Sequence, residues 1–229
     1  MSAGVPPRLP SDVLSHWFGG NWLDLKNMST EDSSHLMGLW FGIDGTTYQK
    51  LDAPVGAAHD ASCMPFVDLI YACKKGELDE LPEWRSDEGL YAKLLLCDQY
   101  SRNCFRGTSE AFAFDELAVT FARRLYEGKH HESYTSMTPF IFLATPAQHS
   151  ENIKDHEMNA EIVDYFQKKF PGYEANMIAS HCKDHKEVID KFGRYPHRNA
   201  ALNRESTPEE KEWLAGDIPS WAGSQIQNI

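Results

Sequence analysis

The helical spacing of apolar positions is the feature that most constrains the fold, and it is clearest between residues 173 and 192. Five residues of this segment recur at intervals of 3, 4, 3 and 4: Ile178, His181, His185, Val188 and Phe192. This spacing places them on one face of an α-helix. Gly193 follows directly, and glycine often ends helices because it adopts a left-handed backbone conformation at little cost. We therefore predict an amphipathic helix over residues 173–192.

The same periodicity predicts helices over residues 11–18, 65–75, 84–103, 109–127, 138–170 and 207–214. We expect Ser11 or Asp12 to cap the first of them, and Pro146 to kink or restart the long one. No segment alternates apolar and polar residues as a strand does, and no glycine-rich phosphate loop follows a strand. The sequence therefore predicts an all-α fold, built from antiparallel helix pairs.

The 229 residues fit one domain. We expect a flexible, proline-rich N-terminus over residues 1–10, a single all-helical domain over 11–215 and an irregular C-terminal tail over 216–229. Within the domain, residues 38–42 predict a packed aromatic anchor, and residues 52–60 predict a surface connection. The predicted helices indicate no second domain.

Charge and cysteine usage exclude several classes of partner. The formal net charge of −12 argues against nucleic acid and against an anionic membrane, since both bind positive surfaces. The five cysteines form no CxxC pair, which is typical of reduced thiols. The first residues lack the apolar core of a signal peptide, and no apolar run is long enough to cross a bilayer. We expect a soluble, cytoplasmic protein.

The densest group of functional side chains lies in the turn after residue 192. Between Gly193 and Thr207 the chain carries the following: Arg194, His197, Arg198, Asn199, Arg204 and Glu205. Gly193 and Pro196 favour an ordered, non-helical path here. Thr207 begins a capping box with Glu210 and restarts the helix. We interpret the segment as a rigid turn that presents catalytic or ligand-binding groups.

A second group lies near the end of the predicted helix 84–103. Asp98, Arg102 and Arg106 follow one another at intervals of four residues. One interpretation is an internal ion pair of Asp98 with Arg102. The other is that Asp98 orients Arg102 and leaves Arg106 and the amide of Asn103 free to bind an anion.

Histidines occupy positions expected to face inward on two helices. His149, Ile153, His156, Ala160 and Val163 share one predicted face. On the helix 173–192, His181 and His185 do the same. Such groups need partners when they leave water, and we expect these partners to include Asp98, Glu151 and Glu205.

Three chemistries are open to these residues. Acid–base catalysis would use His185, His197 or His149, with Asp98 and Glu151 as carboxylates and the arginines as anion clamps. A metal site on His181 and His185 lacks a third ligand, and we predict none. A thiol nucleophile would come from one of three residues: Cys97, Cys104 or Cys182.

Several motifs resemble the family known as domain of unknown function 924, over about residues 13–215. The matching segments are His-Trp-Phe-Gly19, Leu-Trp-Phe-Gly42, Leu-Leu-Cys-Asp-Gln-Tyr-Ser-Arg-Asn-Cys-Phe-Arg-Gly107, Phe-Ala-Phe-Asp115, Pro146-Ala-Gln-His-Ser-Glu151, Phe-Gly-Arg-Tyr-Pro-His-Arg-Asn199 and Arg-Glu-Ser-Thr-Pro-Glu-Glu210. The resemblance implies a tetratricopeptide-like stack of helix pairs. It implies no reaction or cofactor, because fold alone does not give function.

Three functions therefore remain open. The first is an enzyme acting on a small anionic metabolite through a pocket of catalytic and ligand-binding residues. We expect this pocket to contain Asp98, Arg102, Asn103, Arg106, His149, Glu151, His185, Arg194, His197, Arg198, Asn199 and Glu205. The second is a binding module that holds a peptide or acidic ligand in a helical groove. The third is a polar core with a purely structural role.

Overall fold

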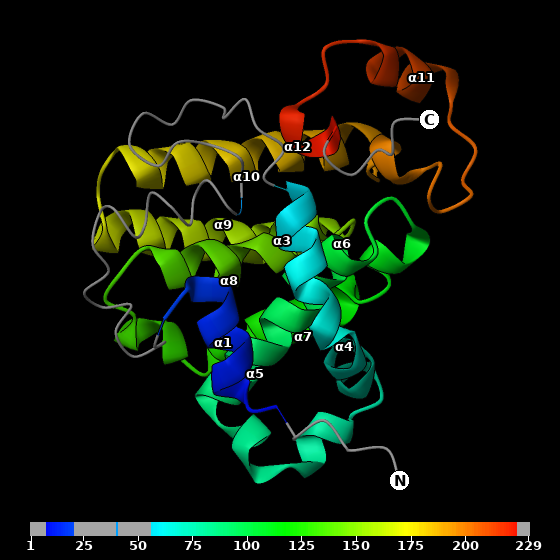
Figure 1. The fold of residues 1–229 in the computed structure, drawn as a ribbon. Coiled ribbons are helices and arrows are strands. Elements are labelled where there is room, and N and C mark those ends of the chain that lie inside the picture. Colours follow the sequence, from blue (N-terminus) through cyan, green and yellow to red (C-terminus); the bar gives the residue numbers. More distant parts are fainter. Residues whose placement is uncertain (1–7, 21–39, 41–55, 224–229) are drawn as a thin grey trace, which may run out of the picture.

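The described part of the chain is built from helices and turns, without a β-strand (Figure 1). The computed structural model describes residues 8–20, 40 and 56–223. The predicted all-α class is confirmed. No helix of these residues is long and apolar enough to cross a membrane.

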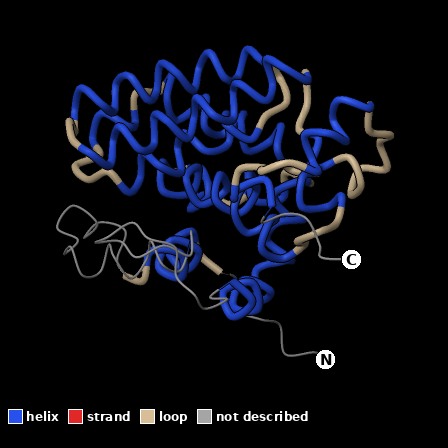
Figure 2. The backbone as a smooth tube through the Cα atoms, turned by 90° about the horizontal axis from the view of Figure 1, so that it is seen from above, coloured by secondary structure: helices blue, strands red, loops and turns tan. Residues whose placement is uncertain are grey.

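The helices vary in length from four to twenty residues. They are α1 (Pro10–Phe18), α3 (Gly56–Cys63), α4 (Val67–Lys74), α5 (Asp87–Leu95), α6 (Ser101–Cys104), α7 (Asp115–Glu127), α8 (Thr138–His149), α9 (Ile153–Lys169), α10 (Tyr173–Phe192), α11 (Pro208–Ala215) and α12 (Ser220–Gly223). The three helices α8, α9 and α10 lie side by side and, with short connections, run antiparallel (Figures 1 and 2). The tetratricopeptide-like stacking stays a prediction.

Local end signals set several helix boundaries. The helix α10 spans the predicted residues and ends at Gly193, whose φ of 67° is left-handed. The helix α1 begins at Pro10, earlier than predicted. Instead of capping it directly, Asp12 lies in the first turn and accepts a hydrogen bond from the backbone N of Leu9 at 2.7 Å.

Of the two predictions for Pro146, that it restarts the long helix is wrong, and that it kinks the helix stays a prediction. Pro146 lies inside α8, which continues to His149. A proline cannot donate to the carbonyl four residues earlier, but the Thr145 hydroxyl donates to this carbonyl of Phe142 at 3.2 Å. The break falls at residues 150–152 instead. There the side chain of Asn152 caps α9 by accepting from the backbone N of Lys154 at 3.1 Å.

This break also overturns the predicted helix face that joined His149 to Val163. His149 ends α8, whereas Ile153 opens α9 and is 39% exposed. Ala160 is exposed as well, while His156 and Val163 are buried.

The predicted helix 84–103 is divided into three parts. Ser86 caps α5, residues Leu96–Tyr100 form a π-helical turn, and α6 ends at Cys104. A π-helical turn holds one more residue than an α-helical turn, and such turns are frequent at functional sites. The next helix, α7, begins only at Asp115, because a short 3-10 turn, Ser109–Phe112, follows Gly107.

Two segments that we expected to be irregular contain helices. Residues 56–63 form α3, where the sequence predicted a surface connection, and residues 220–223 of the predicted tail form α12. Of the predicted aromatic anchor, Trp40 lies among the described residues and stacks on Trp17 at 6.1 Å between ring centroids. Residues 1–7, most of the anchor and residues 224–229 lie outside the described part.

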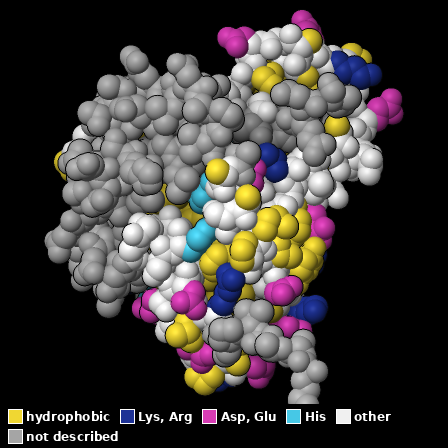
Figure 3. Space-filling model, viewed as in Figure 1, with side chains coloured by type: hydrophobic (Ala, Val, Ile, Leu, Met, Phe, Trp, Pro, Cys, Tyr) yellow, Lys and Arg dark blue, Asp and Glu magenta, His cyan; other side chains and the backbone are white. Residues whose placement is uncertain are grey.

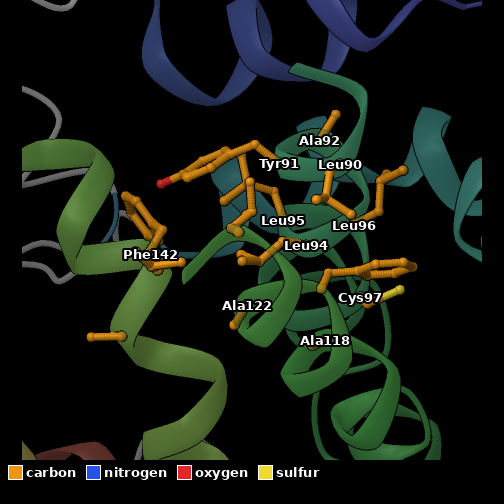
Figure 4. Close-up of a cluster of buried hydrophobic side chains, with 14 of the residues drawn as sticks. Leu90, Tyr91, Ala92, Leu94, Leu95, Leu96, Cys97, Ala118, Ala122 and Phe142 are labelled. Carbon is orange, nitrogen blue, oxygen red and sulfur yellow. The ribbon is translucent and has the colours of Figure 1, made fainter. Parts of the chain in front are cut away.

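The main core lies where α1, α5, α7 and α8 meet. Figure 4 shows Leu94 and Leu95 of α5 packed toward Ala122 of α7 and Phe142 of α8. All four side chains are fully buried. This core fixes the end of α8 and the π-helical turn that follows α5, which carry polar groups described next.

We predict that Leu95→Ala lowers the free energy of unfolding by about 2–5 kcal/mol, because it removes buried methyl groups and leaves a cavity. Urea denaturation measures this loss. Leu81, which is 37% exposed, is the control, and Leu81→Ala should change stability by about 0.5 kcal/mol or less. Equal losses in the two variants would contradict the packing described for α5.

Candidate functional site

Ionised and imidazole side chains from distant parts of the chain meet beyond this core. We call this group the central polar cluster, and its members are Asp98, Arg102, Asp115, His149, His185, His197 and Arg198. They come from the π-helical turn, α6, α7, α8, α10 and the turn that follows α10. The structure thus brings together seven groups that lie up to a hundred residues apart in sequence.

The shortest contact of the cluster joins a carboxylate to an imidazole. Asp98 Oδ1 lies 2.7 Å from His149 Nδ1, and the Asp98 side chain is fully buried. Burial acts to raise the pKa of Asp98, but His149 and Arg102 outweigh it and hold the pKa below its ordinary range. Asp98 is therefore ionised and accepts the Nδ1 proton of His149.

The other ring nitrogen of His149, Nε2, forms no hydrogen bond within the described part of the chain. Burial lowers the pKa of His149, Arg102 lowers it further, and Asp98 offsets part of this effect. The ring is therefore neutral near neutral pH, with its proton on Nδ1 and a lone pair on Nε2. The described part of the chain gives Nε2 no hydrogen-bond partner, and 18% of the side chain is exposed.

Asp115 bridges the two arginines of the cluster. Its oxygens lie 2.9 Å from Arg102 Nη2 and 3.0 Å from Arg198 Nη1. Arg102 also pairs with Asp98 at 3.3 Å, as the first of our two interpretations predicted. Arg198 in turn donates to the backbone carbonyl of His149 at 2.8 Å. Two carboxylates thus offset two guanidinium groups within the cluster.

His185 is held by partners on both ring nitrogens. Nδ1 donates to the backbone carbonyl of His181 at 2.7 Å, so Nε2 accepts from the side-chain amide of Gln148 at 3.2 Å. The thiol of Cys182 donates to the Gln148 oxygen and fixes the amide orientation. Trp221 of α12 stacks on the His185 ring at 3.7 Å. Burial lowers the pKa of His185 far below its ordinary value, so this histidine is neutral and closed off.

His197 is buried beside three arginines of the cluster and of the turn. The side chain is 8% exposed, and burial together with Arg198, His149, Arg102 and Arg204 lowers its pKa to about 2. Among the described residues its Nδ1 atom finds no hydrogen-bond partner. His197 is therefore a neutral imidazole.

A neighbouring network holds the other residues predicted from the turn. Glu151 accepts from the backbone N of Tyr195 at 2.8 Å and forms a bidentate pair with Arg204, with N–O distances of 2.6 and 2.9 Å. These contacts offset the effect of burial and lower the pKa of Glu151. Asn199 accepts from Arg204 at 3.0 Å. The Glu151 carboxylate thus fixes the shape of the turn.

Arg194 does not reach the cluster as a free clamp. Its guanidinium forms a bidentate pair with Glu210, at 2.7 and 2.9 Å, and donates to the carbonyl of Glu205. Glu205 is exposed and contributes this backbone oxygen. Glu210 also completes the predicted capping box with Thr207, which is confirmed.

Arg106 and Asn103 belong to a different part of the molecule. Arg106 forms a bidentate pair with Asp60 of α3, at 2.7 and 2.8 Å, and the Asn103 amide donates to the Cys63 sulfur at 3.5 Å. The alternative that these two side chains stay free for an anion is wrong, because a carboxylate from α3 fills this position. Histidine side chains are visible at the surface between α1 and α3, close to this ion pair (Figure 3).

Metal and thiol chemistry find little support in the geometry. His181 is exposed, and the described residues hold no group of three His, Cys, Asp or Glu side chains close enough to bind a metal ion. Burial raises the pKa of Cys104 and Cys182 to about 12 and that of Cys97 well above its ordinary value. These thiols are therefore not activated nucleophiles.

Sequence reasoning missed three residues that shape the cluster: Asp115, Gln148 and Trp221. Asp115 is the last residue of the motif Phe-Ala-Phe-Asp. An acidic residue in a motif of the family resemblance was a signal that it could belong to the site. Gln148 directly precedes the predicted site residue His149. Trp221 had no signal, because its contact with His185 depends on how the chain returns after α11.

Comparisons with known proteins identify a family and a fold, and they give no reaction. The profile of a family described as "Bacterial protein of unknown function (DUF924)" matches residues 13–217. Among solved structures, the chain is similar to a protein of unknown function from Agrobacterium tumefaciens. The two share 26% identity and a TM-score of 0.60, over 90% of this chain and 96% of that one. No curated protein matches the chain.

We predict that Glu210→Gln changes stability in a pH-dependent way. The hydrogen bond from Arg194 is the main cause that lowers the pKa of Glu210 from 4.5 to about 2. A lowered pKa stabilises the fold above the unfolded value and loses this contribution as pH falls through the folded value. The wild type should therefore exceed the variant in stability near neutral pH, and the difference should shrink between pH 4.5 and about 2.

Urea denaturation at a series of pH values measures this difference. The exposed neighbour Glu209, which lies 3.4 Å from Lys191, supplies the control Glu209→Gln, for which we expect a small difference throughout. A Glu210 difference that stays constant across the acidic window would contradict the assignment of its pKa.

Proposed function

Because the chain belongs to the DUF924 family of bacterial proteins, whose function is unknown, we propose a function from its own residues: it is an enzyme for acid–base chemistry on a small anionic molecule. The Asp98–His149 pair carries the proposal. A buried carboxylate that accepts the Nδ1 proton fixes the tautomer of the ring and leaves the basic lone pair on Nε2. His185, by contrast, has partners on both ring nitrogens.

In the proposed reaction, His149 Nε2 accepts a proton from a carbon, oxygen or nitrogen atom of the substrate. Asp98 stabilises the imidazolium that forms, and it stays ionised throughout. The proton then returns to the product or leaves to water, so the pair is regenerated. Arg102 supports the step indirectly, because it holds Asp98 ionised and lowers the pKa of the free imidazole.

The charge distribution supports an anionic substrate. The charged side chains with the strongest effect on the His197 ring, namely Arg198, Arg102 and Arg204, are positive. Arg198 Nε is a buried donor without a hydrogen-bond partner in the described part of the chain. Both observations favour an oxyanion beside this arginine. The cofactor is unknown, and a cytoplasmic location without nucleic-acid or membrane partners stays a prediction.

We predict that His149 is neutral, with its proton on Nδ1, near neutral pH. The lowered pKa and the contact with ionised Asp98 require this state. Long-range nitrogen–proton NMR on the labelled full-length chain distinguishes the two ring nitrogens and gives the titration midpoint. A midpoint above the ordinary histidine value, or a proton on Nε2, would remove the basis for a general base.

The catalytic role is tested with a substrate found by thermal-shift screening of phosphates and carboxylates. His149→Ala should lower kcat by about 10²–10⁴-fold while the folded state and ligand binding persist. His181→Ala removes an exposed histidine and should leave kcat unchanged. If His149→Ala only lowers the melting temperature and turnover of the folded fraction is normal, the cluster is a structural polar core.

A further inference from the structure

A cleft at the opposite end of α8 from His149 has the properties of a second binding site. It is lined by Thr135, Ser136 and Met137, which lead into α8, by Lys169 at the end of α9, and by residues 170–172, which connect α9 to α10. Its volume is about 470 Å³. The twelve residues of α8 separate the cleft from His149 by roughly 16 Å. The cleft is therefore not part of the central polar cluster.

The main polar group of the cleft is the ammonium of Lys169. Its Nζ donates to the backbone carbonyl of Glu132 at 2.7 Å and lies 5.7 to 5.9 Å from the ring centroids of Phe140, Tyr165 and Phe170. These contacts orient the charge without neutralising it. No carboxylate among the described residues pairs with it, and two of its three N–H donors remain for a ligand.

The adjacent lysine differs from Lys169 in this respect. Lys168 belongs to the same last turn of α9, and its Nζ lies 2.5 Å from Asp164. The chain carries 34 acidic and 22 basic residues, so acidic partners are abundant. A positive group with no such partner is therefore an available site for an external anion.

A hydroxyl group in the cleft also favours an anionic ligand. Ser136 lines the cleft, and its Oγ is buried without a hydrogen-bond partner in the described part of the chain. A buried polar atom without a partner is unfavourable, and such atoms are rare in folded proteins. A bound oxygen anion would accept the Ser136 proton and remove this cost.

Two helix starts beside the cleft add partial positive charge, although in the first turn of α8 Pro139 has no N–H and the Phe140 N–H donates to the Met137 carbonyl at 2.9 Å. The helix α8 begins at Thr138, directly after the lining residue Met137, and α10 begins at Tyr173, directly after Gly172. The first turn of a helix has N–H groups without helical partners and carries partial positive charge. Both helix starts therefore favour an anion in the cleft, in addition to Lys169 and Ser136.

We propose that this cleft binds the oxyanion group, a phosphate or a carboxylate, of a small organic molecule. Lys169 and Ser136 bind the oxyanion, and Met137, Phe170 and Pro171 supply apolar surface for the rest of the molecule. The site does not depend on the function proposed for His149, because the two sets of residues are separate.

The test is a titration of the full-length chain, followed by amide NMR, with inorganic phosphate, acetate and phenyl phosphate at constant ionic strength. We expect saturable shifts at residues 135–138 and 169–173, with phenyl phosphate binding more tightly than phosphate. Stronger binding of acetate than of phosphate would identify the group as a carboxylate. Shifts that do not saturate with any of the three anions at millimolar concentration would overturn the proposal.

Two variants and one control assign the effect to the named residues. Lys169→Gln keeps a donor for the Glu132 carbonyl but loses the charge, and it should weaken binding about tenfold or more. Lys168→Gln should weaken binding less than about twofold, since Lys168 is already paired. Equal weakening in both variants would mean that only general surface charge attracts the anion.

Ser136→Ala separates binding from folding. Because the Ser136 hydroxyl has no partner in the free protein, its removal should leave the melting temperature unchanged or higher, yet weaken anion binding by about tenfold. A lower melting temperature with unchanged binding would overturn its role. His149→Ala should leave binding at this cleft intact, so the outcome here is independent of the proposed enzyme.

Discussion

The pairing of buried charges through Asp115 is the constraint on which the central polar cluster depends. Its carboxylate contacts two arginines that are almost fully buried, Arg102 of α6 and Arg198 of the turn after α10. A guanidinium group removed from water is stable only with such a partner. Because Asp115 opens α7, this single residue ties three distant segments together and thereby fixes the position of the Asp98–His149 pair.

The two central histidines differ in the group that accepts their Nδ1 proton. His185 donates to a backbone carbonyl, its Nε2 is occupied by Gln148, and Trp221 covers the ring. His149 donates to a buried carboxylate, and its Nε2 is open. Both rings are neutral because burial lowers their pKa. In the proposed function, the Nδ1 partner of each ring therefore distinguishes the proposed base His149 from His185 more clearly than its pKa does.

The sequence predicted the features that depend on neighbouring residues. Gly193 ends α10 and Thr207 caps α11 because each acts within one turn of its own helix. The errors come from distant contacts or from local substitutes. Pro146 stays inside α8 because a nearby hydroxyl replaces the missing donor. Arg106 is paired by a carboxylate from α3, and Trp221 reaches the cluster from α12. Helix periodicity contains no information about these partners.

The segment that begins with the π-helical turn Leu96–Tyr100 has two sides with different partners, because α6 ends at Cys104, between Arg102 and Arg106. Asp98 and Arg102 face the central cluster, whereas Arg106 faces Asp60 on α3. Deleting one residue here would restore a regular helix and rotate everything downstream by about 100°. Both arginines would then lose their carboxylates at once. Evolution can therefore exchange side chains along this segment far more readily than it can change its length.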